Sequence, residues 1–242
     1  EVPGKKVQLR DDFFTPVGIT SSAYTVFQNS ELKDLVAPLV SEGLITVTNI
    51  GYLGTGSKVF IQAEMSESYT IVGEEHKGSL TLLNSHDGSS ALAAGVTDTR
   101  VVCSNTFASA LTDLDTRIRH TSDIGVKALD ITSTINFVNE GMKRFSQATE
   151  LLAATRCTED TLNDLITAAY GRETVRARNQ IVEFYRAGTG NEGRTLYDAL
   201  NGVTEYVTHH SNKKEEKRFA SSNFGAGAAV SRRFMNHALA LV

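Results

Sequence analysis

Residues 78–111 read GSLTLLNSHDGSSALAAGVTDTRVVCSNTFASAL, and the pattern in this stretch decides the predicted fold. Residues 80–83 form an apolar run typical of a buried strand, and residues 91–96 form a second one. Between them, residues 84–90 are rich in turn-forming side chains, so we expect the two runs to pair as a hairpin. After Asp98, the expected cap, the apolar spacing changes to that of a helix. The stretch therefore predicts an antiparallel hairpin that leads into a helix.

The strand pattern extends toward the N-terminus. Short strands are predicted between residues 5 and 27, followed by a half-buried helix at residues 32–40. Residues 45–63 alternate apolar and polar side chains around a glycine-rich turn, which indicates another hairpin. Together, residues 45–96 are predicted to form an antiparallel meander.

The C-terminal part shows helical spacing instead. The predicted helices cover residues 99–114, 124–154, 158–170, 173–187 and 195–209 and a stretch from residue 221 to the end, with a charged loop at 211–222. The predicted fold class is therefore α+β, an antiparallel β-meander with an early helix followed by a mainly helical C-terminal half. No linker-like composition interrupts it, so we expect a single domain over residues 1–242, mostly strands at 1–98 and mostly helices at 99–242.

The charge is modest overall but uneven along the chain. A net charge of −4 argues against wholesale adhesion to nucleic acid or membranes. From Arg172 onward, however, eleven Lys and Arg stand against seven Asp and Glu, which points toward a polyanionic partner. The two cysteines, Cys103 and Cys157, are typical of reduced thiols, and no apolar run reaches the roughly 18 residues of a membrane helix. We therefore expect a cytoplasmic protein without membrane contact.

Two glycine motifs have the spacing of nucleotide-binding loops but the wrong context. Gly188, Gly190 and Gly193 match the dinucleotide fingerprint, yet they follow a predicted helix rather than a strand. The Gly54–Lys58 segment resembles part of a phosphate loop but joins two strands. No nucleophile elbow is present and no base is paired with Cys103, so the sequence predicts no catalytic residue and no cofactor.

Two sets of side chains are candidates for metal binding. His86 and Asp87 lie in the polar turn and are combined with His120, while Glu205 and His209 lie four residues apart on one helix face. Neither set matches the spacing of the two-histidine zinc motifs. The hydrogen-bonding residues of the turn are more readily explained as turn formers.

Several stretches resemble a family of phage and plasmid proteins of unknown function. The matching stretches are Tyr24–Asn29, Leu83–Ser90, Arg100–Thr106, Ile118–Thr121, Leu200–Val207 with His209, and Gly225–Ala228. One departure is Thr208, where the family has Asp. The order of meander and helix is similar, more distantly, to the core of single-strand annealing recombinases, which implies a ring-forming module with single-stranded DNA in a basic groove.

On this basis we expect a single-stranded DNA binding or annealing protein of phage type, acting in recombination as a homo-oligomeric ring or filament rather than as an enzyme. Its expected nucleic-acid contacts are Arg100, Arg117, Arg119, His120, Lys213, Lys214, Lys217 and Arg218. Two alternatives are kept: a metal-assisted enzyme acting on nucleic acid, and a phage-encoded module that binds a host defence protein.

Overall fold

The structure is a computed structural model that describes residues 2–102, 105–109, 117–118, 120, 131–171, 174–211 and 214–242. These residues group into two compact units, each described by itself below. Unit 1 comprises Glu1–Glu67, Ser79–Val96 and Leu111–Val138, and unit 2 comprises Ser68–Gly78, Thr97–Ala110 and Asn139–Val242. Because each unit draws on three segments, no single cut of the chain separates them.

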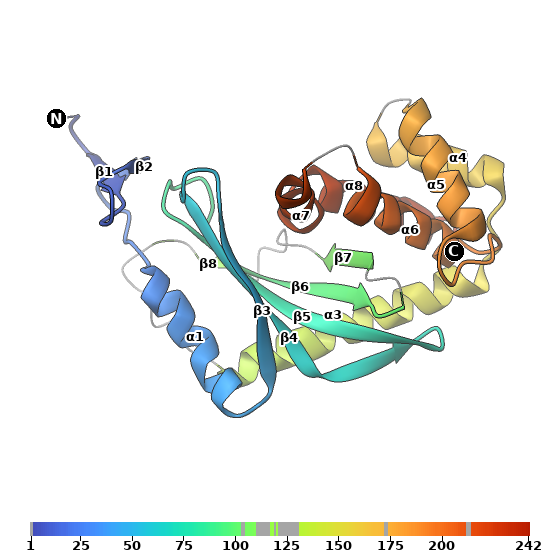
Figure 1. The fold of residues 1–242 in the computed structure, drawn as a ribbon, viewed down its shortest axis with the longest axis horizontal. Helices are drawn as coiled ribbons and strands as arrows, with labels where there is room; N and C mark the ends of the chain where they lie inside the picture. The colour runs from blue at the N-terminus through green and yellow to red at the C-terminus, as the bar shows by residue number, and fades with distance from the viewer. Residues whose placement is uncertain are drawn as a thin grey trace. The chain divides into compact units, whose positions relative to one another are not determined.

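The fold is α+β, as the sequence predicts (Figure 1). The strands are β1 (Lys5–Leu9), β2 (Pro16–Ser21), β3 (Ile45–Leu53), β4 (Lys58–Ile71), β5 (Glu74–Ser85), β6 (Leu92–Arg100), β7 (Asn105–Ser109) and β8 (Arg117–Ile118). The helices are α1 (Asn29–Ser41), α3 (Ile131–Ala154), α4 (Glu159–Tyr170), α5 (Val175–Ala187), α6 (Leu196–Glu205), a π-helical turn (Tyr206–His210), α7 (Glu215–Phe224) and α8 (Ala226–Leu239).

The predicted meander is confirmed as a sheet. Its strand order is β3-β4-β5-β6-β7, and β8 pairs with the first two residues of β6. β3 and β4 are antiparallel from the pair Ile45–Met65 to the pair Leu53–Lys58, with an irregularity between Val47 and Asn49. β1 and β2 form a separate antiparallel pair. β4 runs unbroken to Ile71, beyond residue 63, where the predicted hairpin ends.

In unit 1, α1 contacts β3. Leu32, Val36 and Leu39 recur at helical spacing and are buried, which places the apolar face of α1 in the core. At the start of this helix, Glu31 Oε2 accepts the backbone N–H of Gln28 at 2.6 Å. Pro38 lies inside the helix, as predicted, and Gly43 follows its end with a φ of +72°.

Unit 2 is mainly helical, with β7 and parts of β4, β5 and β6, and the boundaries of its helices follow capping residues. Thr158 accepts a hydrogen bond from the N–H of Thr161 and caps α4, and Gly171 ends that helix in the left-handed conformation. Thr195 and Asp198 form a capping box at the start of α6. Nearly all of α6 is buried, so this helix is the centre of the unit. Within the described residues, no helix combines the length and apolar character needed to cross a membrane.

Two sequence predictions are wrong. Asp98 caps no helix, because β6 continues to Arg100 and residues 105–109 form β7; the remainder of that predicted helix lies outside the described residues. α7 begins at Glu215, within the charged loop that was predicted over residues 211–222. The buried residues of α7 include Ser221, Ser222 and Asn223, and this small polar set leaves no apolar stripe for sequence reasoning to detect.

Candidate functional site

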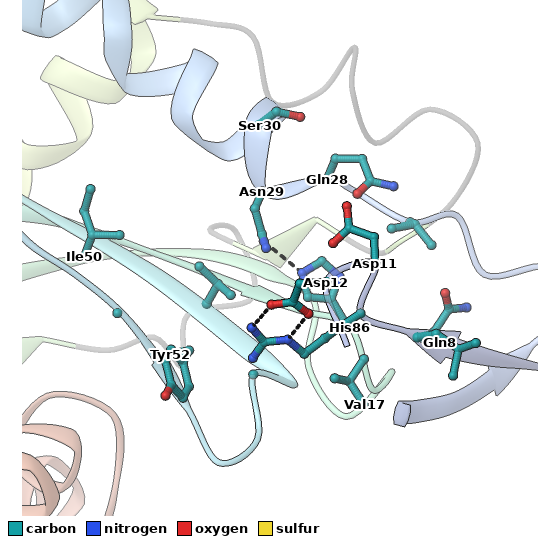
Figure 2. A pocket seen from close by; sticks show the side chains of 16 residues that line it. Gln8, Asp11, Asp12, Val17, Gln28, Asn29, Ser30, Ile50, Tyr52 and His86 are labelled. Atoms are coloured by element: carbon teal, nitrogen blue, oxygen red, sulfur yellow. Dashed lines mark hydrogen bonds and ion pairs between the residues drawn. The ribbon is translucent and has the colours of Figure 1, made fainter. Parts of the chain in front are cut away.

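An open groove of about 810 Å³ lies in unit 1 (Figure 2). This volume is within the usual range of ligand sites. Its walls come from β1 and β2 with the turn between them, from β3, from the first residues of α1, and from the turn after β5. Both polar and apolar side chains line it: Gln8, Leu9, Arg10, Asp11, Asp12, Val17, Val26, Gln28, Asn29, Ser30, Ile50, Gly51, Tyr52, Gly56, Val59 and His86.

Arg10 joins the β1–β2 turn to the β3–β4 turn. Its Nη1 donates to the carbonyl oxygen of Thr55 at 3.3 Å, and its Nε donates to Asp12 Oδ1 at 2.9 Å. Nη2 pairs with the other oxygen of Asp12, which makes the bidentate pair visible in Figure 2. An added Cβ at Gly56 would lie 2.7 Å from Arg10 Nη1, so glycine at this position lets the guanidinium reach the turn.

Exposed rings stand next to this guanidinium. The Cζ of Arg10 is 5.9 Å from the ring centre of Phe13 and 5.9 Å from that of Tyr52. Both distances are within the range of cation–π attraction. Tyr52 is 63% exposed and Ile50, two residues before it on β3, is 69% exposed, so this side of the groove offers apolar surface to a ligand.

His86 forms the polar part of the groove. Its backbone N–H donates to the carbonyl of Ser57 at 2.7 Å, and its Nε2 lies 2.8 Å from Asn29 Oδ1, at the start of α1. Burial lowers the pKa of the His86 ring, against the opposing field of Asp87, so the neutral imidazole is favoured. Asn84, which is fully buried, donates from Nδ2 to the carbonyl of Phe27 at 2.7 Å.

Asp87 holds the turn after β5 in shape. Its Oδ1 accepts the hydroxyl of Ser85 at 2.6 Å and the backbone N–H of Ser89 at 2.8 Å. Burial raises the pKa of this carboxyl, but the hydrogen bonds from Ser85 and Ser89 outweigh burial and lower it to about 2. The polar residues of the predicted turn therefore lie close together, and their main role is to support the groove.

His120 lies in unit 1 but not at its surface. It is 7% exposed, its Nδ1 lies 3.1 Å from the carbonyl oxygen of Thr25, and its ring stacks on Tyr24 with centres 4.6 Å apart. Burial lowers its pKa, although the carbonyl of Thr25 opposes this. The hydroxyl of Tyr24 donates to the carbonyl of Ser85. His120 thus packs against the segment that precedes α1.

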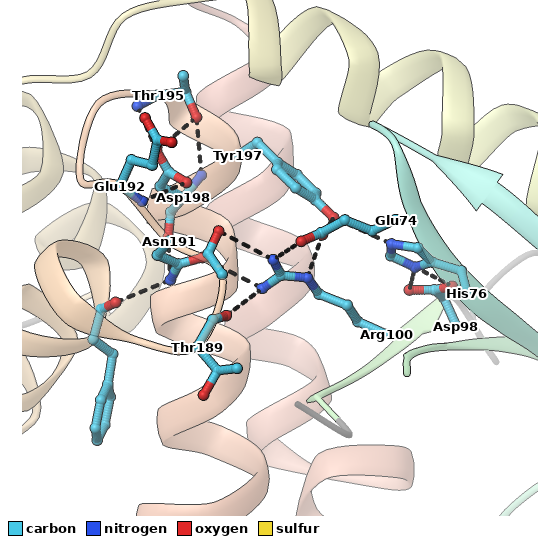
Figure 3. Close-up of polar contacts among 12 residues, drawn as sticks. Glu74, His76, Asp98, Arg100, Thr189, Asn191, Glu192, Thr195, Tyr197 and Asp198 are labelled. Atoms are coloured by element: carbon cyan, nitrogen blue, oxygen red, sulfur yellow. Dashed lines mark hydrogen bonds and ion pairs between the residues drawn. The ribbon is translucent and has the colours of Figure 1, made fainter. Parts of the chain in front are cut away.

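Arg100 is at the centre of a buried polar network in unit 2 (Figure 3). Its side chain is 2% exposed and forms a two-point ion pair with Glu74. Nη1 also donates to the carbonyl of Thr189 at 3.0 Å, and Nη2 to that of Gly190 at 3.3 Å. The guanidinium is therefore used internally, to hold the loop after α5, and is not presented to a phosphate.

The network continues to His76, Asp98 and Tyr197. His76 Nδ1 lies 2.9 Å from both carboxylate oxygens of Asp98, and its Nε2 lies 3.2 Å from the hydroxyl of Tyr197. Burial raises the pKa of Asp98, while the hydrogen bond from His76 opposes it. The cavity beside this network measures about 10 Å³, room for one water at most. Such a closed cluster stabilises the unit and leaves no space for a substrate.

The remaining residues predicted to contact nucleic acid are divided between the two units. Lys214 and Lys217 are exposed at the start of α7 in unit 2, and Arg218, half-buried, follows them. Arg117 is in β8 of unit 1, opposite Ala93. The side chain of Arg117 and the residues Arg119 and Lys213 lie outside the described residues. Among the other cations of unit 2, Arg186 pairs with Glu159 and Arg194 with Glu192.

The metal candidates do not form a complete ligand set. In the described part of the chain, no three His, Cys, Asp or Glu side chains are grouped so that they could hold a metal ion. The side chains of His86 and Asp87 make the hydrogen bonds described above. Glu205 ends α6 and His209 is in the π-helical turn; Glu205 Oε2 and His209 Nε2 are buried and have no hydrogen-bond partner in the structure.

Sequence reasoning missed Arg10 and Tyr52 of the groove with Phe13 on the turn beside it, and Glu74 and Tyr197 of the network. A signal for the first group existed. Phe13 and Phe14 follow two aspartates in what reads as a turn, where polar residues are usual. For the second group no signal existed, since partners up to 123 residues apart are joined only by folding.

Comparison with known proteins gives one match. Neither the curated proteins nor the solved structures contain a match to this chain. Residues 16–226 match a family described as a domain of unknown function, DUF932. Because this match spans most of the chain, the protein belongs to the DUF932 family.

Proposed function

We propose that the protein binds single-stranded nucleic acid and that the groove of unit 1 receives its bases. The observation that carries this proposal is the chemistry of the groove wall. Arg10 in the wall lies beside the exposed ring of Tyr52, which also lines the groove, and beside the exposed ring of Phe13 on the adjoining turn. Amide, hydroxyl and imidazole groups line the same space. Aromatic faces that stack on bases, combined with nearby cations, are how proteins bind single strands without strong sequence preference.

The groove suits bases better than phosphates. Arg10 is paired with Asp12, and Asp11 also lines the groove, so the groove offers little net positive charge to a phosphate. Carboxylates accept hydrogen bonds at base edges, and amides both accept and donate them. The neutral His86 ring offers an acceptor at Nδ1, because its Nε2 donates to Asn29 Oδ1. The backbone would then run outside the groove, near the exposed Lys5 and Lys6 of β1.

This arrangement predicts a shallow salt dependence. Each phosphate contact on a single strand releases about 0.7 counterion, so two or three lysines give a slope of about −2 in a plot of log K against log salt. The seven cations predicted from sequence would give a slope of about −5. The sequence also predicts a more specific activity than binding, the annealing of complementary strands. Annealing requires that the bound bases can leave the groove and pair with a second strand.

The test is a fluorescence-anisotropy titration of a labelled single-stranded oligonucleotide. We expect Gln28→Ala and Asn29→Ala, both in the groove wall, to weaken binding. We expect the matched surface variant Lys214→Ala/Lys217→Ala on α7 to leave it nearly unchanged. Absence of binding at low salt would refute the proposed function, and loss of binding only in the α7 variant would move the site to unit 2.

A further inference from the structure

The turn between β1 and β2 carries the two most exposed of the large apolar side chains described. Phe13 is 78% exposed and Phe14 is 74% exposed. Two adjacent phenylalanines in water are unfavourable, because each keeps a large apolar area hydrated. A turn needs neither ring to reverse the chain, so their presence at the tip points to a ligand that covers them.

The backbone at this tip is both strained and fixed. Phe14 has a φ of +51°, a conformation that bulky residues rarely adopt and that glycine adopts freely. The N–H of Arg10 donates to the carbonyl of Thr15 at 3.0 Å, and the N–H of Phe13 donates to Asp12 Oδ1 at 2.9 Å. Strain of this kind at an exposed, well-held aromatic turn is typical of binding elements.

The tip is also next to the groove. Arg10, which holds the turn, stands 5.9 Å from the ring of Phe13 and 5.9 Å from the ring of Tyr52. A planar, apolar group with polar edges would stack on these rings while its edge reached the side chains of the groove. A nucleobase has this chemistry.

We propose that Phe13, Phe14 and Tyr52 form a stacking platform for consecutive bases of a single strand. This role rests on the proposed binding of single-stranded nucleic acid, and it assigns the affinity to stacking rather than to charge. Removal of one stacked ring costs about ten-fold in affinity in single-strand binding proteins. Because stacking involves no counterions, its loss should leave the salt slope unchanged.

Two comparisons test the platform. First, a normal oligonucleotide is compared with an abasic one of equal length, which has the same phosphates. Second, Phe13→Ala and Tyr52→Ala are compared with Ile19→Ala, a control on β2 that removes an exposed side chain outside the groove lining. Circular dichroism confirms that each variant folds.

The platform predicts that the abasic strand binds at least about ten-fold more weakly, that each aromatic variant loses about ten-fold, and that Ile19→Ala loses little. Phe14→Gly should raise thermal stability, by relieving the positive φ, yet weaken binding. Equal affinity for both strands, with unaffected aromatic variants, would overturn the platform while leaving single-strand binding intact. No binding to either strand would refute the proposed function itself. A change in oligomeric mass in Phe13→Ala, without loss of affinity, would assign the tip to a second copy of the chain instead.

Discussion

The backbone of Gly18 in β2 lies directly against Asp87 in the turn after β5. A Cβ added at Gly18 would be 2.8 Å from the Cβ of Asp87 and closer still to its Cα. Only glycine permits this approach, which docks the β1–β2 pair onto the rest of unit 1 and so closes one side of the groove. An isolated pair of strands is marginally stable in water, so this contact is needed to hold the pair in place.

Gly18→Ala should therefore displace the β1–β2 pair. We expect a loss of about 1 to 3 kcal/mol in the free energy of unfolding, as for other overpacked sites, together with weaker oligonucleotide binding. Urea denaturation and anisotropy measure the two effects. Gly4→Ala is the control: a Cβ there meets nothing within 4 Å, so binding should persist despite some backbone strain at its φ of +73°. Unchanged stability in Gly18→Ala would contradict the docked arrangement.

Arg100 should matter for stability and not for nucleic-acid binding. Arg100→Met leaves Glu74 and two loop carbonyls without their donor, and loss of one partner from a buried ion pair costs about 3 to 5 kcal/mol. The double variant Arg100→Met/Glu74→Met should recover part of this loss, because no unpaired charge remains. A urea-based double-mutant cycle measures the coupling. If Arg100→Met folded normally but lost oligonucleotide binding, the sequence prediction of a direct contact would be restored.

Asp87 should confer stability that is lost in acid. Its pKa is about 2 in the folded protein, below the ordinary value of 3.8, so the folded state prefers the ionised carboxyl. Its stabilising effect is present above pH 3.8 and disappears as the pH falls toward 2. Asp87→Asn should be less stable than the wild type at pH 6, with a difference that shrinks across this interval. A difference in stability between the two proteins that is the same at every pH would show that the charge of the Asp87 carboxyl does not contribute to stability.

His86 and His120 should make unit 1 less stable below neutral pH. Burial lowers the pKa of both rings below 6.5, so the unfolded chain binds protons before the folded one does. Stability is then complete above pH 6.5 and declines as the pH falls toward 5. Thermal unfolding at these two pH values measures the decline. The double variant His86→Gln/His120→Gln should show a smaller decline, and an unchanged decline would assign it to other groups.

The sequence was informative where local pattern and fold agree. The apolar runs on either side of residues 84–90 lie in β5 and β6 as predicted, and the helix predicted over residues 158–170 is α4, between the caps Thr158 and Gly171. Asp98 was misassigned because its side chain bonds His76 across the sheet rather than a helix N-terminus. A cap and a cross-strand partner look the same in sequence, since both are polar residues at the end of an apolar run.

The candidate site was less predictable than the fold. Arg100 was among the predicted nucleic-acid contacts, yet its charge is cancelled by Glu74, 26 positions earlier in the chain. The groove depends on Arg10 reaching Thr55 and on His86 reaching Asn29, contacts that span 45 and 57 positions. Pairings at such separations follow from the folded chain and are not encoded by spacing.

Ultraviolet cross-linking of the 242-residue chain to a single-stranded oligonucleotide, followed by mass spectrometry of the linked peptides, tests the central claim most directly. Binding in the groove of unit 1 predicts adducts on Tyr52 and on the peptide that contains Phe13 and Phe14. Adducts confined to the segment of Lys214, Lys217 and Arg218, or no adducts at low salt, would contradict it.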